Sequence, residues 1–308
     1  MSVILYNAVN PGLRTIERDL YEQICDEVSR FGILCRVFSR VKSEKSLMEK
    51  IERKGLGYYN QNKKMQDLFG IRIVAYFYED LDFIEILLSK CFKEVNRNVD
   101  NGGLTEFKPL PRNIVFSLPD KDAKTLEEIK STYGDYFQYI DSTFEVQLRS
   151  VLSEGWHEVD HVLRYKCHEE WEGIPEYDRM LNGIYATLET SDKALKALFD
   201  DVAYRHYKKH NITGMLRTKF RLDFLPSELS VGLNNILSEN NSVWKKIMKI
   251  DRKEFLDILS GSHIHLPVTF DNLVFIINRM FLNNNDIRLL EPLNVKSDLD
   301  ELKFDNMD

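Results

Sequence analysis

Residues 144–166 read FEVQLRSVLSEGWHEVDHVLRYK, and the spacing of the apolar residues changes within this stretch. The first six residues alternate between apolar and polar side chains, which predicts a β-strand with one apolar and one charged face. From Val151 onward the apolar residues recur at helical spacing, so we expect a helix to follow directly. A strand with Glu145, Gln147 and Arg149 on one face is costly to bury in a core. The pattern is typical of the floor of a site that binds a metal ion and phosphates.

The composition of the chain is that of a globular protein with its own core. It has 308 residues, of which 43% are hydrophobic and 30% are charged. The length predicts two domains, or one domain with a large appendage. The formal net charge of −7 gives no global reason to expect DNA, RNA or an anionic membrane as a partner.

The cysteines and the apolar stretches indicate the compartment. The four cysteines lie far apart without paired spacing, which is typical of reduced thiols in the cytoplasm. The N-terminal sequence lacks the basic and apolar regions of a signal peptide, and the stretch NLVFIINRMFL is too short and too interrupted to span a membrane. We therefore expect a cytoplasmic protein that binds neither DNA nor a membrane.

The order of strand and helix patterns predicts an α+β fold, with a mixed β-sheet of four or five strands flanked by helices. Strands are expected at residues 33–41, 70–78, 112–118 and 142–149, and helices at residues 11–31, 44–55 and 81–92. Residues 94–110 are rich in Asn and Gly and are expected to form a loop.

The second half of the chain is predicted to be helical. We expect residues 1–170 to form one domain, 171–210 a helical extension packing on it, and 211–308 a helical module. The extension is predicted to be one long helix whose apolar face, from Met180 to Tyr204, covers the sheet or, in the alternative, forms a surface for a partner. The chain from Leu282 onward is polar and acidic, so we expect a partly disordered tail.

The stretch SRVKSEKSLMEKIERKG, residues 39–55, combines basic residues with a helix start. Two cations lie at the end of a strand, and a serine and two further cations lie on one face of the next helix: Arg40 and Lys42, then Ser46, Lys50 and Arg53. Cations that converge near a helix N-terminus form an anion site, because the first-turn amides and the helix dipole add to their charge. The alternative is an ordinary solvated basic face.

A third segment, MQDLFGIRIVAYF, places an acidic residue just before an apolar strand. Asp67 stands at the mouth of the strand and Arg72 lies within it. A carboxylate in this position can hold Mg²⁺ through oxygen ligands. In the alternative interpretation, Asp67 ends a short helix and Arg72 pairs with a neighbouring carboxylate.

Together, the three segments resemble the synthetase domain of the RelA/SpoT family, the enzymes that make guanosine alarmones. The family pattern R-x-K-x-x-x-S-x-x-x-K-x-x-R/K is present as Arg40, Lys42, Ser46, Lys50 and Arg53, and D-x-x-G-I-R is present as Asp67 to Arg72. The E-x-Q-x-R strand and the helix after it are present as Glu145, Gln147, Arg149, Asp160, His161, Tyr165 and Lys166. The resemblance covers roughly residues 10 to 170, with no sign of the family's hydrolase domain or long regulatory tail.

The resemblance implies a nucleotidyltransferase-like synthetase fold and a specific reaction. Such enzymes transfer the β,γ-pyrophosphate of ATP to the 3′-hydroxyl of a guanine nucleotide, GDP or GTP, and release AMP. It implies Asp67 and Glu145 as the catalytic pair and as the ligands of Mg²⁺, with Glu145 also placed to act as general base. The residues implied to bind ATP are Arg40, Lys42, Ser46, Lys50, Arg53 and Arg72.

The acceptor side departs from the family pattern. The family has an N-G-Y-R-S-L-H-like segment whose tyrosine stacks on the acceptor guanine, whereas this chain has GGLTEFKPLPRNIVFSLP. Phe107 can stack in place of the tyrosine, or it simply packs the loop. The residues assigned to the acceptor are Phe107, Arg112, Asn113, Gln147, Arg149, His161 and Lys166.

The identity of the acceptor is left open by this departure. Three acceptors are compatible with the sequence: a guanine nucleotide, an adenine nucleotide and the 3′ end of a tRNA. The last would belong to a toxin-like relative acting in phage defence. A tRNA would need clustered cations, and the basic stretch from Arg205 to Arg221 offers them unless it is a solvated or salt-bridged face. A catalytically inactive nucleotide-binding regulator is a further alternative, and a homo-oligomer is also left open.

A rival metal motif lies in the same segment as the third family motif. Residues His157 to His161 match H-E-x-x-H, the zinc-protease signature, with two histidines on one helical face. Asp160 places a charge inside that motif, and no third ligand follows at a familiar spacing. We therefore favour magnesium over zinc.

Overall fold

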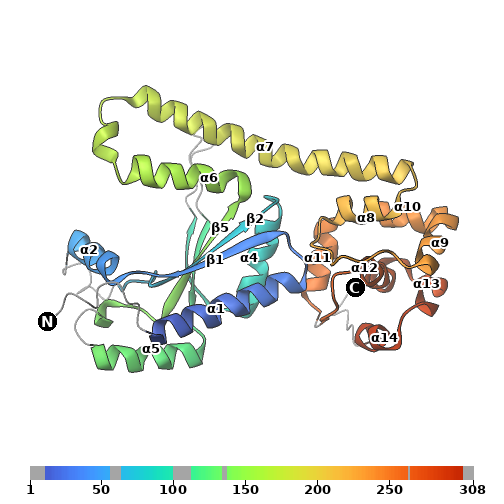
Figure 1. The fold of residues 1–308 in the computed structure, drawn as a ribbon, viewed down its shortest axis with the longest axis horizontal. Helices are drawn as coiled ribbons and strands as arrows, with labels where there is room; N and C mark the ends of the chain where they lie inside the picture. The colour runs from blue at the N-terminus through green and yellow to red at the C-terminus, as the bar shows by residue number, and fades with distance from the viewer. Residues whose placement is uncertain (1–10, 56–63, 100–111, 134–136, 263, 301–308) are drawn as a thin grey trace. The chain divides into compact units, whose positions relative to one another are not determined.

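The structure is a computed structural model that describes residues 11–55, 64–99, 112–133, 137–262 and 264–300 (Figure 1). The described residues divide into two compact units. The first unit takes its residues from 1–25, 35–81 and 88–189, and the second from 26–34, 82–87 and 190–308. The boundary between 189 and 190 lies inside one long helix, whereas the sequence analysis set its boundaries at residues 170 and 210.

The first unit is built on a five-stranded sheet with the strand order β1-β2-β5-β4-β3. The strands are β1 (Cys35–Val41), β2 (Phe69–Ala75), β3 (Glu94–Val99), β4 (Arg112–Ser117) and β5 (Thr143–Ser150). β2 and β5 pair in parallel, and the other three pairs are antiparallel. The predicted α+β fold with a mixed sheet is confirmed, and β5 is its central strand.

Strand β3 was not predicted, because residues 94–110 were expected to form a loop. Its sequence, EVNRNV, contains Asn twice and lacks an apolar run. It lies at the edge of the sheet, pairs only with β4 and contains a register shift after Glu94. An edge strand has one partner and little burial, so the apolar pattern that identifies interior strands is weak there.

The two faces of the sheet differ in chemistry, as the alternation in β5 predicts. On one face Phe116 and Phe144 are fully buried, with ring centroids 5.6 Å apart, and Phe92 contacts Phe144 edge-on at 5.0 Å. Figure 1 shows α1 (Pro11–Arg30) and α5 (Asp120–Tyr133) on one side of the sheet, with α6 (Val151–Asp160) and the start of α7 (Pro175–Lys208) on the other. Helix α4 (Asp80–Cys91) connects β2 to β3.

Helix α2 (Glu44–Lys54) follows β1 after a short connection. The Ser43 side chain accepts a hydrogen bond from the backbone N–H of Ser46, which caps the helix start. Gly55 ends the helix with φ at 75°, a conformation that favours glycine. Leu47 and Ile51 are buried and define the inward face of the helix.

Strand β5 continues into α6 without a loop. The Ser150 side chain accepts from the backbone N–H of Ser153, and the Ser153 hydroxyl forms the reciprocal contact of a capping box. After α6 the chain forms a π-helical turn, η2 (His161–Tyr165), a 3₁₀ turn, η3 (His168–Trp171), and then α7. The predicted switch from strand to helix after residue 149 is therefore confirmed.

The long helix predicted for residues 171–210 is present as α7, but its expected buried face is wrong. The beginning of α7 contacts α6 where the Trp156 and Tyr185 rings lie 4.9 Å apart, and the Trp156 N–H donates to the Leu181 carbonyl at 2.9 Å. Met180 and Ile184, which were expected to face the sheet, are 64% and 55% exposed. Helical spacing defines a stripe of residues, but packing decides which stripe is covered.

The second unit is helical in its described part. Its remaining helices are α8 (Ile212–Phe220), α9 (Val231–Glu239), α10 (Asn241–Lys249), α11 (Arg252–Ser260), α12 (Phe270–Ile277), the π-helical η4 (Asn278–Leu282), α13 (Asn285–Leu289) and α14 (Leu293–Asp300). Its core contains large side chains with almost no exposure, among them Trp244, Phe220 and Phe255. The described residues from 211 to 300 are therefore mainly helical.

The part of the acidic tail up to residue 300 forms two short helices. Helices α13 and α14 bury Ile287, Val295 and Leu299. Three apolar residues among many polar ones are enough to hold these short helices against the core, although the average composition indicates disorder. Residues 301–308 lie outside the described part of the chain.

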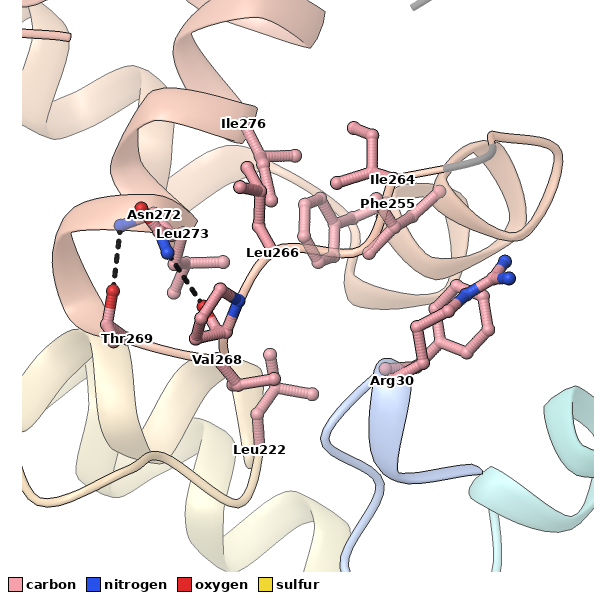
Figure 2. A pocket seen from close by; sticks show the side chains of 13 residues that line it. Arg30, Leu222, Phe255, Ile264, Leu266, Val268, Thr269, Asn272, Leu273 and Ile276 are labelled. Carbon is pink, nitrogen blue, oxygen red and sulfur yellow. Dashed lines mark hydrogen bonds between the residues drawn. The ribbon is translucent and has the colours of Figure 1, made fainter. Parts of the chain in front are cut away.

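A small pocket of about 30 Å³ lies within the second unit (Figure 2). Its walls are largely apolar, with Leu222, Phe255 and Leu273 among them, and Arg30 at one edge. The space suits a water-sized guest and is too small for a nucleotide. Within the described residues, no helix combines the length and apolarity needed to cross a lipid bilayer.

Candidate active site

The carboxylate of Asp67 connects two of the predicted phosphate-binding lysines. Lys42 follows the last residue of β1, and its Nζ donates to Asp67 Oδ2 at 2.5 Å. Lys50 comes from α2, and its Nζ donates to the same oxygen at 2.7 Å. Asp67 itself precedes β2. Two sequence motifs, residues 40–53 and 67–72, therefore meet around one oxygen atom.

The second oxygen of Asp67 is left without such a contact. Oδ1 is buried and has no hydrogen-bond partner among the described residues. A buried carboxylate oxygen without a donor is unfavourable unless a cation or a water satisfies it. Hard divalent cations such as Mg²⁺ prefer carboxylate oxygens, so the donor set at Asp67 fits the implied metal.

Glu145 belongs to the same cluster. Burial and the negative charge of Asp67 raise the pKa of Glu145, while the charges of Lys50 and Lys42 act in the opposite direction. The two carboxylates therefore lie within electrostatic reach of each other and of both lysines.

Arg40 joins the cluster through the sheet register. Arg40 pairs with Gly70 across β1 and β2, and Gly70 pairs with Glu145 across β2 and β5, so all three share one row of the sheet. A Cβ atom at Gly70 would lie 3.4 Å from Arg40 Nε, so the Arg40 side chain lies across the glycine. The glycine of the D-x-x-G-I-R motif thus leaves room for a guanidinium beside the two carboxylates.

The charges of the cluster also affect Asp67 and Lys42. Burial alone would raise the pKa of Asp67, but the hydrogen bonds from Lys42 and Lys50 hold it below its usual value. Burial lowers the pKa of Lys42, although the contact with Asp67 opposes this shift. Asp67 is therefore ionised at neutral pH, and Lys42 loses its proton at lower pH than an exposed lysine.

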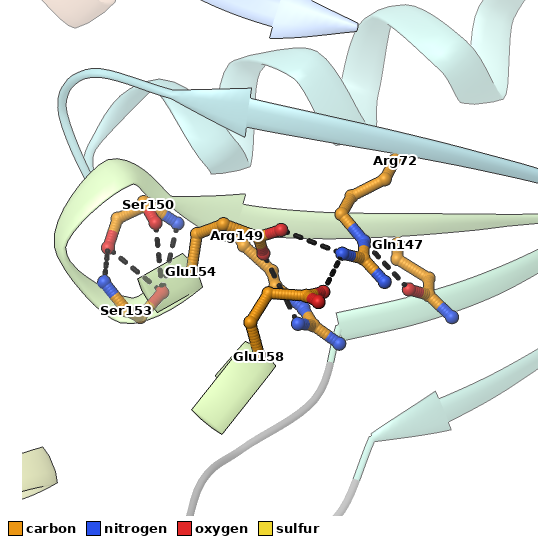
Figure 3. A network of polar contacts seen from close by, with 7 residues as sticks. All are labelled: Arg72, Gln147, Arg149, Ser150, Ser153, Glu154 and Glu158. Atoms are coloured by element: carbon orange, nitrogen blue, oxygen red, sulfur yellow. Dashed lines mark hydrogen bonds and ion pairs between the residues drawn. The ribbon is translucent and has the colours of Figure 1, made fainter. Parts of the chain in front are cut away.

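The next row of the same sheet face carries a second polar network (Figure 3). Arg72 Nε donates to Gln147 Oε1 at 3.3 Å, and Arg72 Nη1 donates to Glu154 Oε1 at 2.7 Å and to Glu158. Arg149 Nη1 donates to the other oxygen of Glu154 at 3.2 Å. Residues of β2, β5 and α6 are thereby held together beside the Asp67 cluster.

Glu154 was not singled out from the sequence, yet it binds two predicted site residues at once. Each of its carboxylate oxygens accepts from a different guanidinium, Arg72 on one side and Arg149 on the other. One sequence pattern could have pointed to Glu154. It lies four residues before Glu158, on a helix that begins directly after the strand containing Arg149. Spacing alone could not show that both arginines point at it.

The remaining residues assigned to ATP lie on α2. Ser46 is half-buried, and its hydroxyl lies 3.0 Å from that of Ser43 in the helix cap. Arg53 is exposed in the last turn. Lys50 is therefore the α2 residue that the structure brings to Asp67.

The residues assigned to the acceptor are divided between the two faces. Asn113 pairs with Gln147 across β4 and β5, so it lies on the face that carries Glu145. Arg112 pairs with Leu148, on the opposite face, and its guanidinium lies 5.1 Å from the Tyr78 ring and donates to the Tyr78 hydroxyl at 3.0 Å. The structure therefore does not bring Arg112 to this site. Phe107 lies outside the described residues.

His161 and Lys166 flank the π-helical turn after α6. The His161 ring stacks on Tyr165 with centroids 5.8 Å apart. Burial, with the charges of Lys166, Arg40 and Arg149, lowers the pKa of His161. These charges place His161 within electrostatic reach of the polar sheet face, although both His161 and Lys166 are exposed.

The H-E-x-x-H motif does not assemble a zinc site among the described residues. Burial lowers the pKa of His157 to about 4, and its ring contacts Trp156 and Tyr185 at centroid distances of 5.4 and 5.9 Å. Glu158 pairs with Arg72. Throughout the described ranges, no group of three or more His, Cys, Asp or Glu residues is arranged to hold a metal ion.

The basic stretch from 205 to 221 is not one continuous surface. Arg221 is buried and donates to Asp200 at 2.8 Å, and burial lowers the pKa of Lys219. Arg217 lies over the Phe270 ring at 5.0 Å. The C-terminal half of the predicted tRNA patch therefore serves packing and ion pairing within the second unit.

Comparisons with known proteins agree with the motifs. The family model described as the region found in RelA / SpoT proteins matches residues 39–170, which confirms the predicted family over this part of the chain. No curated protein matches the chain.

Several solved structures are similar to part of the chain. Small alarmone synthetase 1 from Bacillus subtilis, bound to its product pppGpp, is 21% identical over 63% of this chain and 95% of its own, with a TM-score of 0.46. Small alarmone synthetase 2 from Bacillus subtilis is 16% identical over 63% and 99%, with a TM-score of 0.47. A GTP pyrophosphokinase family protein from Streptococcus pneumoniae is 18% identical over 62% and 91%, with a TM-score of 0.46.

Proposed function

We propose that residues 39–170 form a nucleotide pyrophosphokinase that transfers the β,γ-pyrophosphate of ATP to the 3′-hydroxyl of GDP or GTP and releases AMP. The match to the RelA/SpoT region supports the reaction class. The observation that carries the proposal is the meeting of Asp67 and Glu145 with two lysines and Arg40 on one face of the sheet. The cytoplasm, where ATP and guanine nucleotides are abundant, is the compartment that suits it.

The cations of the cluster would bind the triphosphate. Lys42 and Lys50 can donate to phosphate oxygens in place of Asp67, and Arg40 adds a guanidinium beside them. Phosphoryl transfer depends mostly on positioning and on stabilising negative charge, so these cations should carry much of the rate effect. Asp67 and Glu145 would hold Mg²⁺, which supplies charge neutralisation and polarises phosphate oxygens.

Glu145 is also the residue placed to accept the proton of the acceptor hydroxyl. Burial beside Asp67 raises its pKa, which makes its carboxylate a better base than that of an exposed glutamate. The acceptor oxygen then bonds to the β-phosphorus of ATP, the bond from that phosphorus to the α,β-bridging oxygen breaks, and AMP leaves with that oxygen. The proton taken up by Glu145 is released to solvent afterwards.

The second network would serve the acceptor. Gln147 and Asn113 share one row of the sheet with Arg72, which the family motifs assign to ATP, and Arg149 is linked to the same network through Glu154. A row with guanidinium and amide groups can bind phosphates and the polar edge of a base. We assign the acceptor nucleotide to this part of the face.

The test is a transfer assay with γ-labelled ATP and Mg²⁺, with GDP, GTP, ATP or deacylated tRNA supplied separately as acceptor. We expect label on GDP and GTP, and loss of that label in Glu145→Gln protein with an unchanged circular dichroism spectrum. Label on tRNA alone would show that the acceptor is the 3′ end of a tRNA, as in the toxin-like alternative, and not a guanine nucleotide. Absence of label with every acceptor, while ATP still binds, would identify a regulator and contradict the enzyme proposal.

A further inference from the structure

Asp67 is the proposed metal ligand, and its carboxylate is bound asymmetrically by internal cations. Both lysine contacts, at 2.5 and 2.7 Å, use the Oδ2 atom. The Oδ1 atom is buried and has no hydrogen-bond partner within the described part of the chain. One oxygen is therefore saturated by two ammonium groups while the other has no donor.

The fold fixes both lysines in front of Asp67. The backbone N–H of Lys42 donates to the Leu68 carbonyl at 2.8 Å, which extends the pairing of β1 with β2 to the residue beside Asp67. Lys50 is carried by α2, and its neighbour Ile51 is 3% exposed. Neither lysine is a freely moving surface side chain, because both are less than one-quarter exposed.

The charge of the cluster disfavours a metal ion that arrives alone. Three cations, Arg40, Lys42 and Lys50, face two carboxylates, those of Asp67 and Glu145. A divalent cation that approaches Oδ1 would therefore meet a net positive charge and a carboxylate whose negative charge is already shared with two ammonium groups on Oδ2. A triphosphate reverses both conditions, because its oxygens accept from the lysines and bring negative charge.

We propose that Lys42 and Lys50 form a gate on the metal site, which keeps a divalent cation from Asp67 until a nucleotide triphosphate draws the lysines away. The inference rests on the proposed function for the nature of the nucleotide. Its consequence is positive coupling: the nucleotide tightens metal binding, and the metal tightens nucleotide binding by the same factor. The lysines thus act twice, first as placeholders for the metal and then as ligands of the phosphates.

The test measures metal binding without turnover. Free Mn²⁺ is followed by electron paramagnetic resonance in titrations of the full chain, first without nucleotide and then with a methylene-bridged ATP analogue. For the wild-type protein we expect weak binding of Mn²⁺ alone, tightened by the analogue beyond the binding of Mn²⁺ to the analogue itself. For Lys50→Met we expect Mn²⁺ alone to bind about tenfold more tightly, with a smaller further gain from the analogue.

Three matched variants test the origin of the gain. Lys50→Arg keeps the positive charge and should bind Mn²⁺ as weakly as the wild type. Lys45→Met is the control on the same helix. The Lys45 side chain is 78% exposed and faces Glu49, so its loss should not change Mn²⁺ binding. Adding Asp67→Asn to Lys50→Met should abolish the gain.

The outcomes separate this inference from the proposed function. Equal affinity of wild type and Lys50→Met for Mn²⁺ alone, with equal circular dichroism spectra, overturns the gate. Tighter Mn²⁺ binding by Lys50→Met in a protein without transferase activity supports the gate and contradicts the proposed reaction. If the wild-type protein is active and Lys50→Met shows no tighter Mn²⁺ binding, the proposed reaction stands and the gate is overturned.

Discussion

The two units of the molecule use charged side chains in different ways. In the first unit, charges gather on one face of the sheet, where Asp67 is shared by two lysines and Glu154 by two arginines. In the second unit, charges mainly hold helices in place: Arg252 donates to the Phe220 carbonyl at 2.6 Å, and Arg279 binds the buried Glu291 at 2.6 Å. Under the proposed function, these charges of the first unit bind a ligand, whereas these charges of the second unit stabilise its fold.

Substitutions test this difference between the two units. If it is right, charge removal in the first unit lowers activity more than stability, and truncation of the second unit's core lowers stability.

Trp244→Ala should give the largest change. Trp244 is 2% exposed, and its ring stacks on Tyr207 at 5.5 Å, so truncation leaves a cavity in the second unit. We expect the free energy of unfolding to fall by about 3–5 kcal/mol, measured by urea denaturation. Leu293→Ala, at a residue that is 88% exposed in the same unit, is the matched control and should change it by less than about 0.5 kcal/mol. Similar losses in both variants would show that the core of this unit does not hold it together.

Glu145→Gln should act on the reaction and not on the fold. The substitution keeps the shape and removes a carboxylate needed for the metal and the proton, so we expect kcat to fall by a factor of about 10²–10³, or about 3–4 kcal/mol. Because burial beside Asp67 disfavours the charged form, stability at neutral pH should be unchanged or higher. Steady-state kinetics and urea denaturation of the same preparation measure both. A large loss of stability would contradict the view that the charges of the first unit serve a ligand and not the fold.

The pH profile of kcat/KM should be bell-shaped. Glu145 must be ionised to act, and its raised pKa makes activity fall on acidification at a higher pH than for an ordinary glutamate. Lys42 must be protonated, and its lowered pKa makes activity fall on alkalinisation at a lower pH than for an ordinary lysine. Beyond each limb, activity should drop about tenfold per pH unit.

Lys42→Arg is the variant that tests the alkaline limb. Arginine stays protonated, so the limb assigned to Lys42 should move to higher pH even if the maximum is lower. The acid limb should stay in place. An alkaline limb at the same pH in both proteins would assign it to another group.

Glu154→Gln should have the smallest of these effects. It removes the charge between Arg72 and Arg149 and leaves both guanidiniums less constrained, so we expect kcat/KM for the acceptor to fall by about 1–2 kcal/mol, mainly through KM. Glu158→Gln is the matched control on the same helix. Because the Glu158 side chain is 51% exposed, its loss should cost less than about 1 kcal/mol. Equal losses of kcat/KM in both variants would show that bridging Arg72 and Arg149 gives Glu154 no larger role than Glu158.

Local patterns predicted much of the first unit. The alternation in residues 144–149 and the apolar run after Gly70 predicted β5 and β2, since side chains on a strand alternate strictly between faces. The spacing from Arg40 to Lys50 predicted a strand end followed by a helix with cations near its start. Family motifs added the pairing of Asp67 with Glu145, which no local rule could supply.

Where the predictions failed, the sequence did not show what each segment packs against. The apolar stripe of α7 was expected to be buried, yet Met180 and Ile184 are exposed. The edge strand β3 has too few buried residues to show a pattern, and Arg112 was assigned to a site on the other face of the sheet from the one its register gives it. Each error concerns what a segment packs against, which is a property of the whole fold.

Residue spacing and motif identity predicted most element types of the first unit, the polar face of β5 and the candidate residues for the chemistry, although β3 was missed. The contacts of Lys42 and Lys50 with one oxygen of Asp67, and of Glu154 with Arg72 and Arg149, could be read only from the folded chain. The physical reason is that contacts between residues far apart in the chain depend on strand register and helix placement. Neither is encoded in any short stretch of sequence.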